Sequence, residues 1–140
     1  MANQHEIAPG HNQEASLLPF HQLEPPLFRE YWDPTNLEVE WIDAQDWDAD
    51  GNQQPVPIGY PSEIIRFTVL SIDELAYIKS LCTDPRGFSG PVTRRTYNAT
   101  TKTWIVANGT LIYPRGDRRT SRQGYWTNVR VEIIDLVEIP

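Results

Sequence analysis

Cysteine and long apolar runs are the scarcest features of this 140-residue chain. Its one cysteine, Cys82, excludes an internal disulfide framework and a Cys-x-x-Cys metal site. Apolar runs end after four or five residues, whereas a helix that spans a membrane needs about twenty. The first six residues contain neither a basic nor an apolar stretch, so we expect no secretory signal. The chain is nevertheless long enough for one domain with a core of its own.

Basic residues are almost missing from residues 1–62, which hold eleven acidic residues and only Arg29 as a base. The net charge of this part is -10, whereas residues 63–140 carry a net charge of +3. We expect the two parts to meet, within one chain or between neighbouring copies, because opposite charges attract. The pI of the whole chain is about 4.8, which argues against autonomous nucleic-acid binding.

Residues 1–36 show neither helical nor alternating apolar periodicity, and they contain five prolines. Their large apolar side chains are too many for an ordinary solvated tail. Because proline disfavours both helix and internal sheet pairing, we expect an extended N-terminal arm that lies in a groove of an adjacent chain. A disordered leader is an equally good interpretation of residues 1–15. The arm residues expected at the interface are Leu17, Leu18, Phe20, Leu27, Phe28 and Trp32.

Residues 37–140 are predicted to form one mainly β domain. The dipeptide Asn108-Gly109 favours a type I′ hairpin turn, and we expect further turns at 46–52 and 98–101. Residues 115–124 are expected to form a basic loop. Apolar alternation and β-branched runs predict strands over 37–42, 56–60, 64–70, 92–97, 104–106, 110–113 and 125–137.

One helix is predicted, over residues 71–82. Ser71 and Glu74 have the spacing of a capping box, and Asp84-Pro85 ends the helical pattern. The fold predicted from these elements is a β-sandwich or split barrel with one flanking α-helix and an extended N-terminal arm. The predicted apolar stripe of the helix consists of Ile72, Leu75, Ile78, Leu81 and Cys82.

Residues 46–51 match the first half of a calcium-binding loop motif. Asp46, Asp48 and Asp50 followed by glycine match the first half of the motif, in which alternating carboxylates converge on the cation. Pro57 occupies the twelfth position, where a bidentate glutamate belongs. We therefore favour an acidic turn and keep the three aspartates as a calcium candidate.

No constellation for catalysis is visible. His5, His11 and His21 match no zinc spacing, and Cys82 falls on the apolar stripe of the helix. A glycine-rich phosphate loop, a nucleophile elbow and a His-Glu-x-x-His motif are all absent from the sequence. We therefore predict no catalytic residue, no cofactor and no enzymatic activity.

The basic cluster of the chain is a second candidate interface. A surface that combines arginine with aromatic rings suits nucleic acid, but the acidic pI favours docking on the acidic segment 38–50 of a neighbouring copy. We add Trp47 to this interface because large rigid rings contribute most to such contacts. The cluster consists of Arg115, Arg118, Arg119 and Arg122.

The order of elements over residues 61–138 carries a family resemblance. A strand and a helix are followed by a strand over 91–97, a Trp104-bearing strand, a hairpin at Asn108-Gly109, a loop, and a long last strand that begins near Trp126. This order resembles that of the small minor tail and distal tail proteins of long-tailed bacteriophages. The resemblance implies a tail-tube-like split β-barrel that forms homo-oligomeric rings in the virion, after assembly in the host cytoplasm. The implied partners are further copies and other virion proteins, without a membrane or catalytic residues.

Two alternatives remain open. Within the same class, a capsid-decorating or head–tail joining protein would use an apolar arm equally well. In another class, a carbohydrate-binding β-sandwich would use Trp47 and Trp126 as a stacking platform and the Asp46–Asp50 loop to hold calcium.

Overall fold

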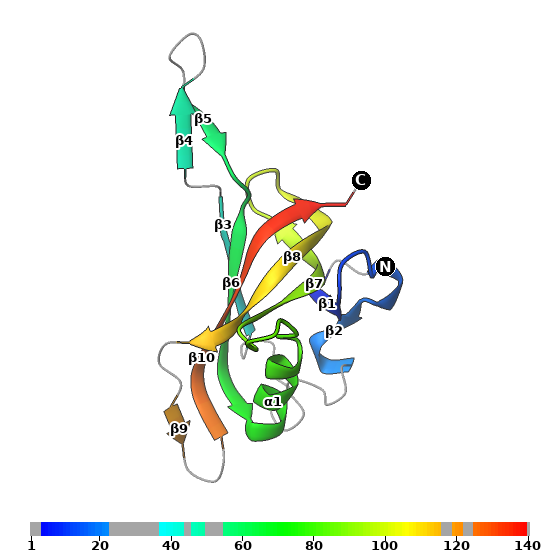
Figure 1. Cartoon of the computed structure of the whole chain (residues 1–140), viewed down its shortest axis with the longest axis vertical. Coiled ribbons are helices and arrows are strands. Elements are labelled where there is room, and N and C mark those ends of the chain that lie inside the picture. Colours follow the sequence, from blue (N-terminus) through cyan, green and yellow to red (C-terminus); the bar gives the residue numbers. More distant parts are fainter. Residues whose placement is uncertain are drawn as a thin grey trace.

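The fold is mainly β, as predicted, and consists of a strongly curled antiparallel sheet with one α-helix (Figure 1). The computed structural model describes residues 4–22, 37–43, 46–49, 55–115, 119–121 and 125–139. Along the sheet the strands follow the order β2-β1-β7-β8-β10-β6-β3, and β9 pairs with β10 beside this path. β4 and β5 form a separate two-stranded sheet. The strands are β1 (Glu6–Pro9), β2 (Leu18–Pro19), β3 (Leu37–Ile42), β4 (Asp46–Ala49), β5 (Pro55–Ile58), β6 (Ser62–Ser71), β7 (Ser89–Asn98), β8 (Thr103–Arg115), β9 (Arg119–Ser121) and β10 (Tyr125–Glu138).

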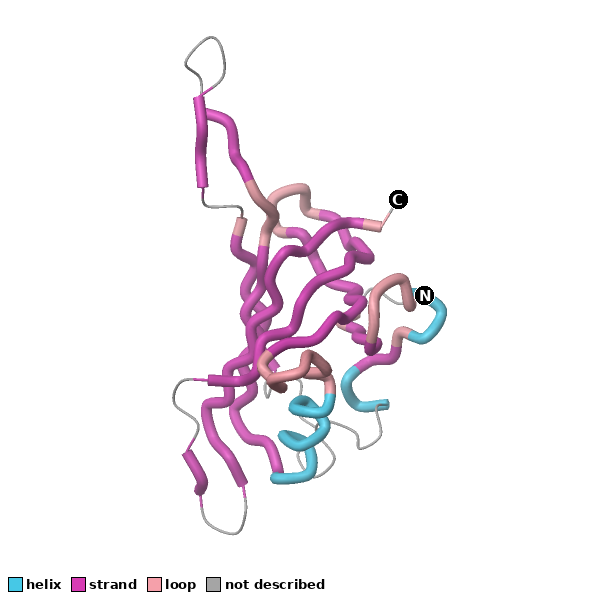
Figure 2. The backbone as a smooth tube through the Cα atoms, viewed as in Figure 1, coloured by secondary structure: helices cyan, strands magenta, loops and turns pink. Residues whose placement is uncertain are grey.

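The concave side of the sheet holds the core. Along β10 the predicted alternation is confirmed, since Val129, Val131 and Ile133 are buried while Arg130 is exposed. The same period places Ile65 and Phe67 of β6 in the core cluster. Figure 2 shows the helical segments on one side of the strands, where α1 packs against β6, β8 and β10.

The helix α1 (Ile72–Ser80) begins one residue later than predicted and ends two residues earlier. Leu75 and Ile78 are buried as expected, but Ile72 is 55 % exposed and does not belong to the buried stripe. Glu74 is buried. The chain continues beyond Ser80 in a tighter turn, in which the amides of Leu81 and Cys82 bond to the carbonyls three residues earlier. No helix in the described ranges is long and apolar enough to cross a membrane.

The predicted hairpin at Asn108-Gly109 is wrong, because β8 runs without a break through both residues. Gly109 is required by close packing: a Cβ there would lie 2.7 Å from Cγ2 of Ile133. Opposite Gly109 the register of β10 shifts between Ile134 and Val137. Asp135 has a φ of 55° at this bulge. A glycine selected for tertiary contact therefore has the appearance of a turn glycine in the sequence.

Two other predicted turns contain strands. The first four residues of the expected turn 46–52 form β4, which pairs with β5. The expected loop 115–124 contains β9, whose residues 119–121 pair with the beginning of β10. Both short strands belong to hairpins that project from the body at opposite ends of the molecule in Figure 1.

Residues 4–22 belong to the same sheet as the rest of the domain. β1 pairs with β7 through the partners Glu6–Arg95, Ile7–Arg94, Ala8–Thr93 and Pro9–Val92, and β2 pairs with β1. Ile7 and Phe20 are 2 % and 4 % exposed and lie in the core. Over these residues, the segment expected as an arm thus seats on the sheet of its own chain. The remainder of the expected arm, 1–3 and 23–36, lies outside the described residues.

Gly90 offers a test of how α1 is fastened to the sheet. A Cβ at this position would overlap the backbone carbonyl oxygen of Leu81, which no side-chain rotation can relieve. Gly90→Ala should therefore lower the free energy of unfolding by about 3 kcal/mol. Gly59→Ala is the control, since Gly59 meets open space and has a φ of +86°; it should cost about 1 kcal/mol. Urea denaturation measures both, and equal losses would contradict the proposed clash.

Candidate functional site

A buried ion pair crosses the interior of the curled sheet. Arg94 of β7 donates from Nε to Oε1 of Glu63 on β6 at 2.6 Å, and both side chains are fully buried. Two strands, β8 and β10, lie between β7 and β6 in the hydrogen-bonded order. The two side chains can meet only because the sheet curls until these strands face each other.

The remaining polar atoms of this pair also have partners. Oε2 of Glu63 accepts a hydrogen bond from Oγ1 of Thr96 at 2.7 Å. Arg94 donates from Nη1 to the carbonyl of Glu6 at 2.8 Å and from Nη2 to Nδ1 of His5 at 3.2 Å. The Phe20 ring lies 5.4 Å from the guanidinium carbon. These partners matter because burying a charge without partners destabilises the folded state by several kcal/mol.

His5 is neutral in this cluster. Arginine has only donors, so Nδ1 of His5 accepts and the ring proton sits on Nε2. The pKa of His5 is lowered from 6.5 to about 4, chiefly by burial and then by the positive charge of Arg94, while Glu63 opposes both effects. The ring also packs edge-on against Trp104, with 5.0 Å between centroids. The buried cluster therefore holds one positive and one negative charge near neutral pH.

A second set of bonds fastens the N-terminal segment to the outer side of β7 and β8. Arg95 donates to Oε1 of Glu6 at 2.5 Å. The backbone amide of Asn12 donates to Oδ1 of Asn108 at 2.8 Å, and the amide of Gln13 donates to Oγ1 of Thr93 at 3.0 Å. A backbone bond from Gly10 to Pro91 and a contact between His11 and the Gly109 carbonyl at 2.9 Å also belong to the set.

The far edge of the sheet is fastened to the β7–β8 turn. Asp43, just after β3, accepts hydrogen bonds from Oγ1 of Thr100 and from Nε1 of Trp41, the latter at 2.8 Å. These bonds, Thr100 foremost, hold the pKa of Asp43 below its ordinary value. They support the same curl that brings Glu63 and Arg94 together.

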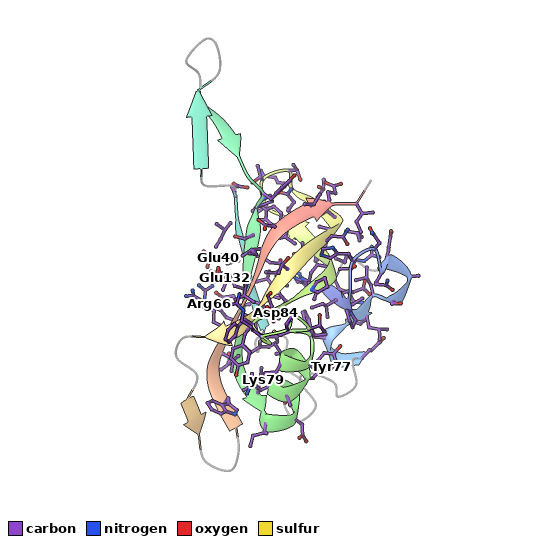
Figure 3. The ribbon with its side chains drawn as sticks, in the orientation of Figure 1. Glu40, Arg66, Tyr77, Lys79, Asp84 and Glu132 are labelled. Carbon is purple, nitrogen blue, oxygen red and sulfur yellow. The ribbon has the colours of Figure 1, made fainter. Side chains whose placement is uncertain are left out.

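The face of the sheet away from α1 carries charged side chains (Figure 3). Nη1 of Arg66 lies 2.7 Å from Oε1 of Glu40 and 3.7 Å from Oε1 of Glu38. On the adjacent strand Arg130 and Glu132 approach to 3.9 Å. Exposed pairs of this kind contribute about 0–1 kcal/mol each. They give the surface its charge pattern rather than its stability.

The structure places the expected interface residues in different surroundings. Leu17 is half-buried, Leu18 is 42 % exposed, and Phe20 packs against Phe67 with 5.9 Å between ring centroids. Trp47 lies in β4, Arg115 in β8 and Arg119 in β9. The other expected interface residues lie outside the described ranges: Leu27, Phe28, Trp32, Arg118 and Arg122.

The metal candidates are likewise divided. Asp46 and Asp48 lie in β4, and Asp50 lies outside the described ranges. Among the described residues, no group of three or more histidine, cysteine, aspartate or glutamate side chains is placed to hold a metal ion. Cys82 is buried, and burial raises the pKa of its thiol.

Sequence reasoning missed the ion pair itself. The alternation of β7 places Arg94 between Val92 and Thr96 on the inner face, which is the available signal. Its partner Glu63 comes 31 residues earlier, and nothing in either segment indicates the other. No protein-family model, curated protein or solved structure matches this chain.

The neutral state of His5 makes stability depend on pH. The folded pKa of about 4 lies below the ordinary 6.5, so the unfolded chain binds the proton more tightly. The contribution of His5 is fully present above pH 6.5 and is lost as the pH falls toward 4, by about 3 kcal/mol in total. His5→Gln keeps an acceptor without a titrating proton. Urea denaturation at pH 7 and pH 4 should show a smaller loss for this variant than for the parent, and equal losses would contradict the assignment.

The coupling of the buried pair can be measured directly. Arg94→Met leaves the Glu63 carboxylate buried without its cation, which should cost about 3–5 kcal/mol. Glu63→Leu should cost a similar amount for the converse reason. In the double variant no unpaired ion remains, so the loss should fall below the sum by more than about 1 kcal/mol. Chemical denaturation of the four proteins tests this, and additive losses would show that the two side chains act independently.

Proposed function

We propose that this protein is a structural, non-enzymatic subunit of a tailed bacteriophage particle that forms rings in the tail or at its tip. The observation that carries the proposal is the architecture: a curled antiparallel sheet with one helix between β6 and β7 and a long final strand. This agrees with the split barrel that the order of elements implied. The expected hairpin at Asn108-Gly109 does not contribute to the likeness, because β8 is continuous there.

Projecting hairpins support an assembly role. The β4–β5 and β9–β10 hairpins extend beyond the curled body at opposite ends (Figure 1). A strand that leaves the core has little to pack against within its own chain, so it is suited to contact a neighbour. Large apolar side chains are also exposed elsewhere on the body, among them Tyr60 at 57 % and Phe88 at 60 %.

The backbone of the exposed residue Phe88 is held in place by hydrogen bonds on both sides. Its backbone amide donates to Oδ1 of Asp84 at 2.8 Å, and its carbonyl accepts from the amide of Tyr113 at 2.7 Å. The hydrogen bond from Phe88 also holds the pKa of Asp84 below its ordinary value. An exposed ring on a backbone fixed in this way loses little entropy on binding, which favours a role in protein contacts.

The distribution of charge suggests which surfaces of two neighbouring copies meet. Glu38 and Glu40 are exposed on the edge strand β3, and the acidic segment continues to residue 50. The four arginines of residues 115–122 flank or lie in β9 along the sequence, and β9 lies at the opposite end of the molecule from β4 (Figure 1). We propose that the arginine segment of one copy faces the acidic segment of the next. Long-range attraction of this kind sets association rate and register more than affinity.

The alternatives differ in what they require. A capsid-decorating or head–tail joining protein uses the same surfaces, and the location in the virion separates it from a tail protein. A carbohydrate-binding module would need Trp126 as part of an open platform, but this side chain packs against the hydrophobic core. The described surfaces thus favour partners that are proteins, namely further copies and other virion proteins.

Assembly of the purified full chain tests the proposal. Light scattering and negative-stain electron microscopy at increasing concentration should show closed rings of uniform size. Arg118→Glu combined with Arg119→Glu should slow association, and more strongly at low salt, because screening shortens the range of charge interactions. Arg86→Glu with Lys102→Glu makes the same charge change at exposed residues elsewhere and should have a smaller effect. A monomer at every concentration that binds glycans would overturn the proposal.

A further inference from the structure

The docking of residues 4–22 points to an exchange between copies. We propose that in the assembled ring each copy donates residues 4–22 to its neighbour, where β1 pairs with β7 in the register seen within one chain. This proposal rests on the proposed function and states how one copy holds the next. The partner is a second copy of this chain, and it completes the buried cluster around Arg94.

The segment lies at one edge of the sheet. β1 and β2 are the outermost strands at one end of the sheet path, so they can leave without breaking any other pairing. The hydrogen bonds of the segment reach β7 and β8, at Thr93, Arg94, Arg95 and Asn108. The segment therefore contacts the sheet as a bound peptide does.

The seat is incomplete when the segment is absent. Arg94 would lose the Glu6 carbonyl and the His5 ring as acceptors, while the ring of Phe67 would lose its contact with Phe20. Buried donors without acceptors and uncovered core are both costly. An empty seat must therefore be refilled, and the same segment of another copy meets every one of these requirements.

Charge also suits recognition between copies. Residues 4–22 contain Glu6 and Glu14 and neither lysine nor arginine. The strand that receives them carries Arg95, which donates to the Glu6 carboxylate, and Arg94, which donates to the backbone carbonyl of Glu6. An acidic segment that meets a basic strand is the complementarity found between partners.

The connection to the rest of the chain is long enough for either arrangement. The 14 residues from 23 to 36 separate Gln22 from Leu37, and an extended chain of this length spans up to about 50 Å. The ten-residue strand β6, by comparison, is about 33 Å long. Exchange of identical segments keeps all contacts of the seat and links the copies, which is a low-cost route to oligomers.

A mixing experiment distinguishes exchange from a closed chain. Glu6 and Arg95 are register partners on β1 and β7, at a spacing that accepts a disulfide. In a Cys82→Ala background, one protein carries Glu6→Cys and a second carries Arg95→Cys, so the designed disulfide can form only between chains. The two are unfolded together, refolded, concentrated to assemble and oxidised, then separated under denaturing, non-reducing conditions. Exchange predicts covalent heterodimers well above the homodimers that each variant gives alone.

The doubly substituted chain provides the second readout. Glu6→Cys with Arg95→Cys, oxidised as assembled rings, should give a ladder of covalent multimers. Rings whose chains run only as internally cross-linked monomers, together with no excess of heterodimer in the mixture, would overturn the exchange and leave the proposed function standing. Absence of rings at every concentration of the parent chain would overturn both.

Discussion

The ion pair between Arg94 and Glu63 is the constraint on which the rest of the structure depends. Burying two charges is favourable only with close contact and full hydrogen bonding, and here that contact must be made across a sheet interior rather than between adjacent strands. The sheet must therefore curl, and the N-terminal residues must be present to supply His5 and the Glu6 carbonyl. Curvature, core closure and placement of β1 follow from one requirement.

Local pattern was sufficient for much of this fold. The strands at 37–42, 64–70, 92–97 and 125–137 follow from apolar alternation or from β-branched runs, and the helix follows from its stripe around Leu75 and Ile78. The hairpin at Asn108-Gly109 failed because dipeptide preference does not reveal tertiary contact. Gly109 is small because Ile133 lies against it, and no local pattern contains that information.

The candidate site was harder to predict than the fold. Periodicity assigns Arg94 to an inner face, but a buried arginine is informative only together with its partner, and Glu63 belongs to a different strand. The N-terminal segment shows the reverse situation. Its apolar content indicated that it would be covered, and Ile7 and Phe20 are indeed buried. Side-chain chemistry alone does not tell whether this segment packs on the sheet of its own chain or on that of another copy.

Strand β10 connects the two ends of the molecule mechanically, because it runs from the β9–β10 hairpin through the body of the sheet. Residues 125–127 pair with β9, residues 125–133 with β6 and residues 130–138 with β8. The amide of Leu136 bonds to the carbonyl of Pro61, just after the β4–β5 hairpin. Antiparallel hydrogen bonds stand perpendicular to the strands, so tension along β10 loads many of them together. A pull applied at one end of the molecule is thereby carried to the other by a single uninterrupted strand.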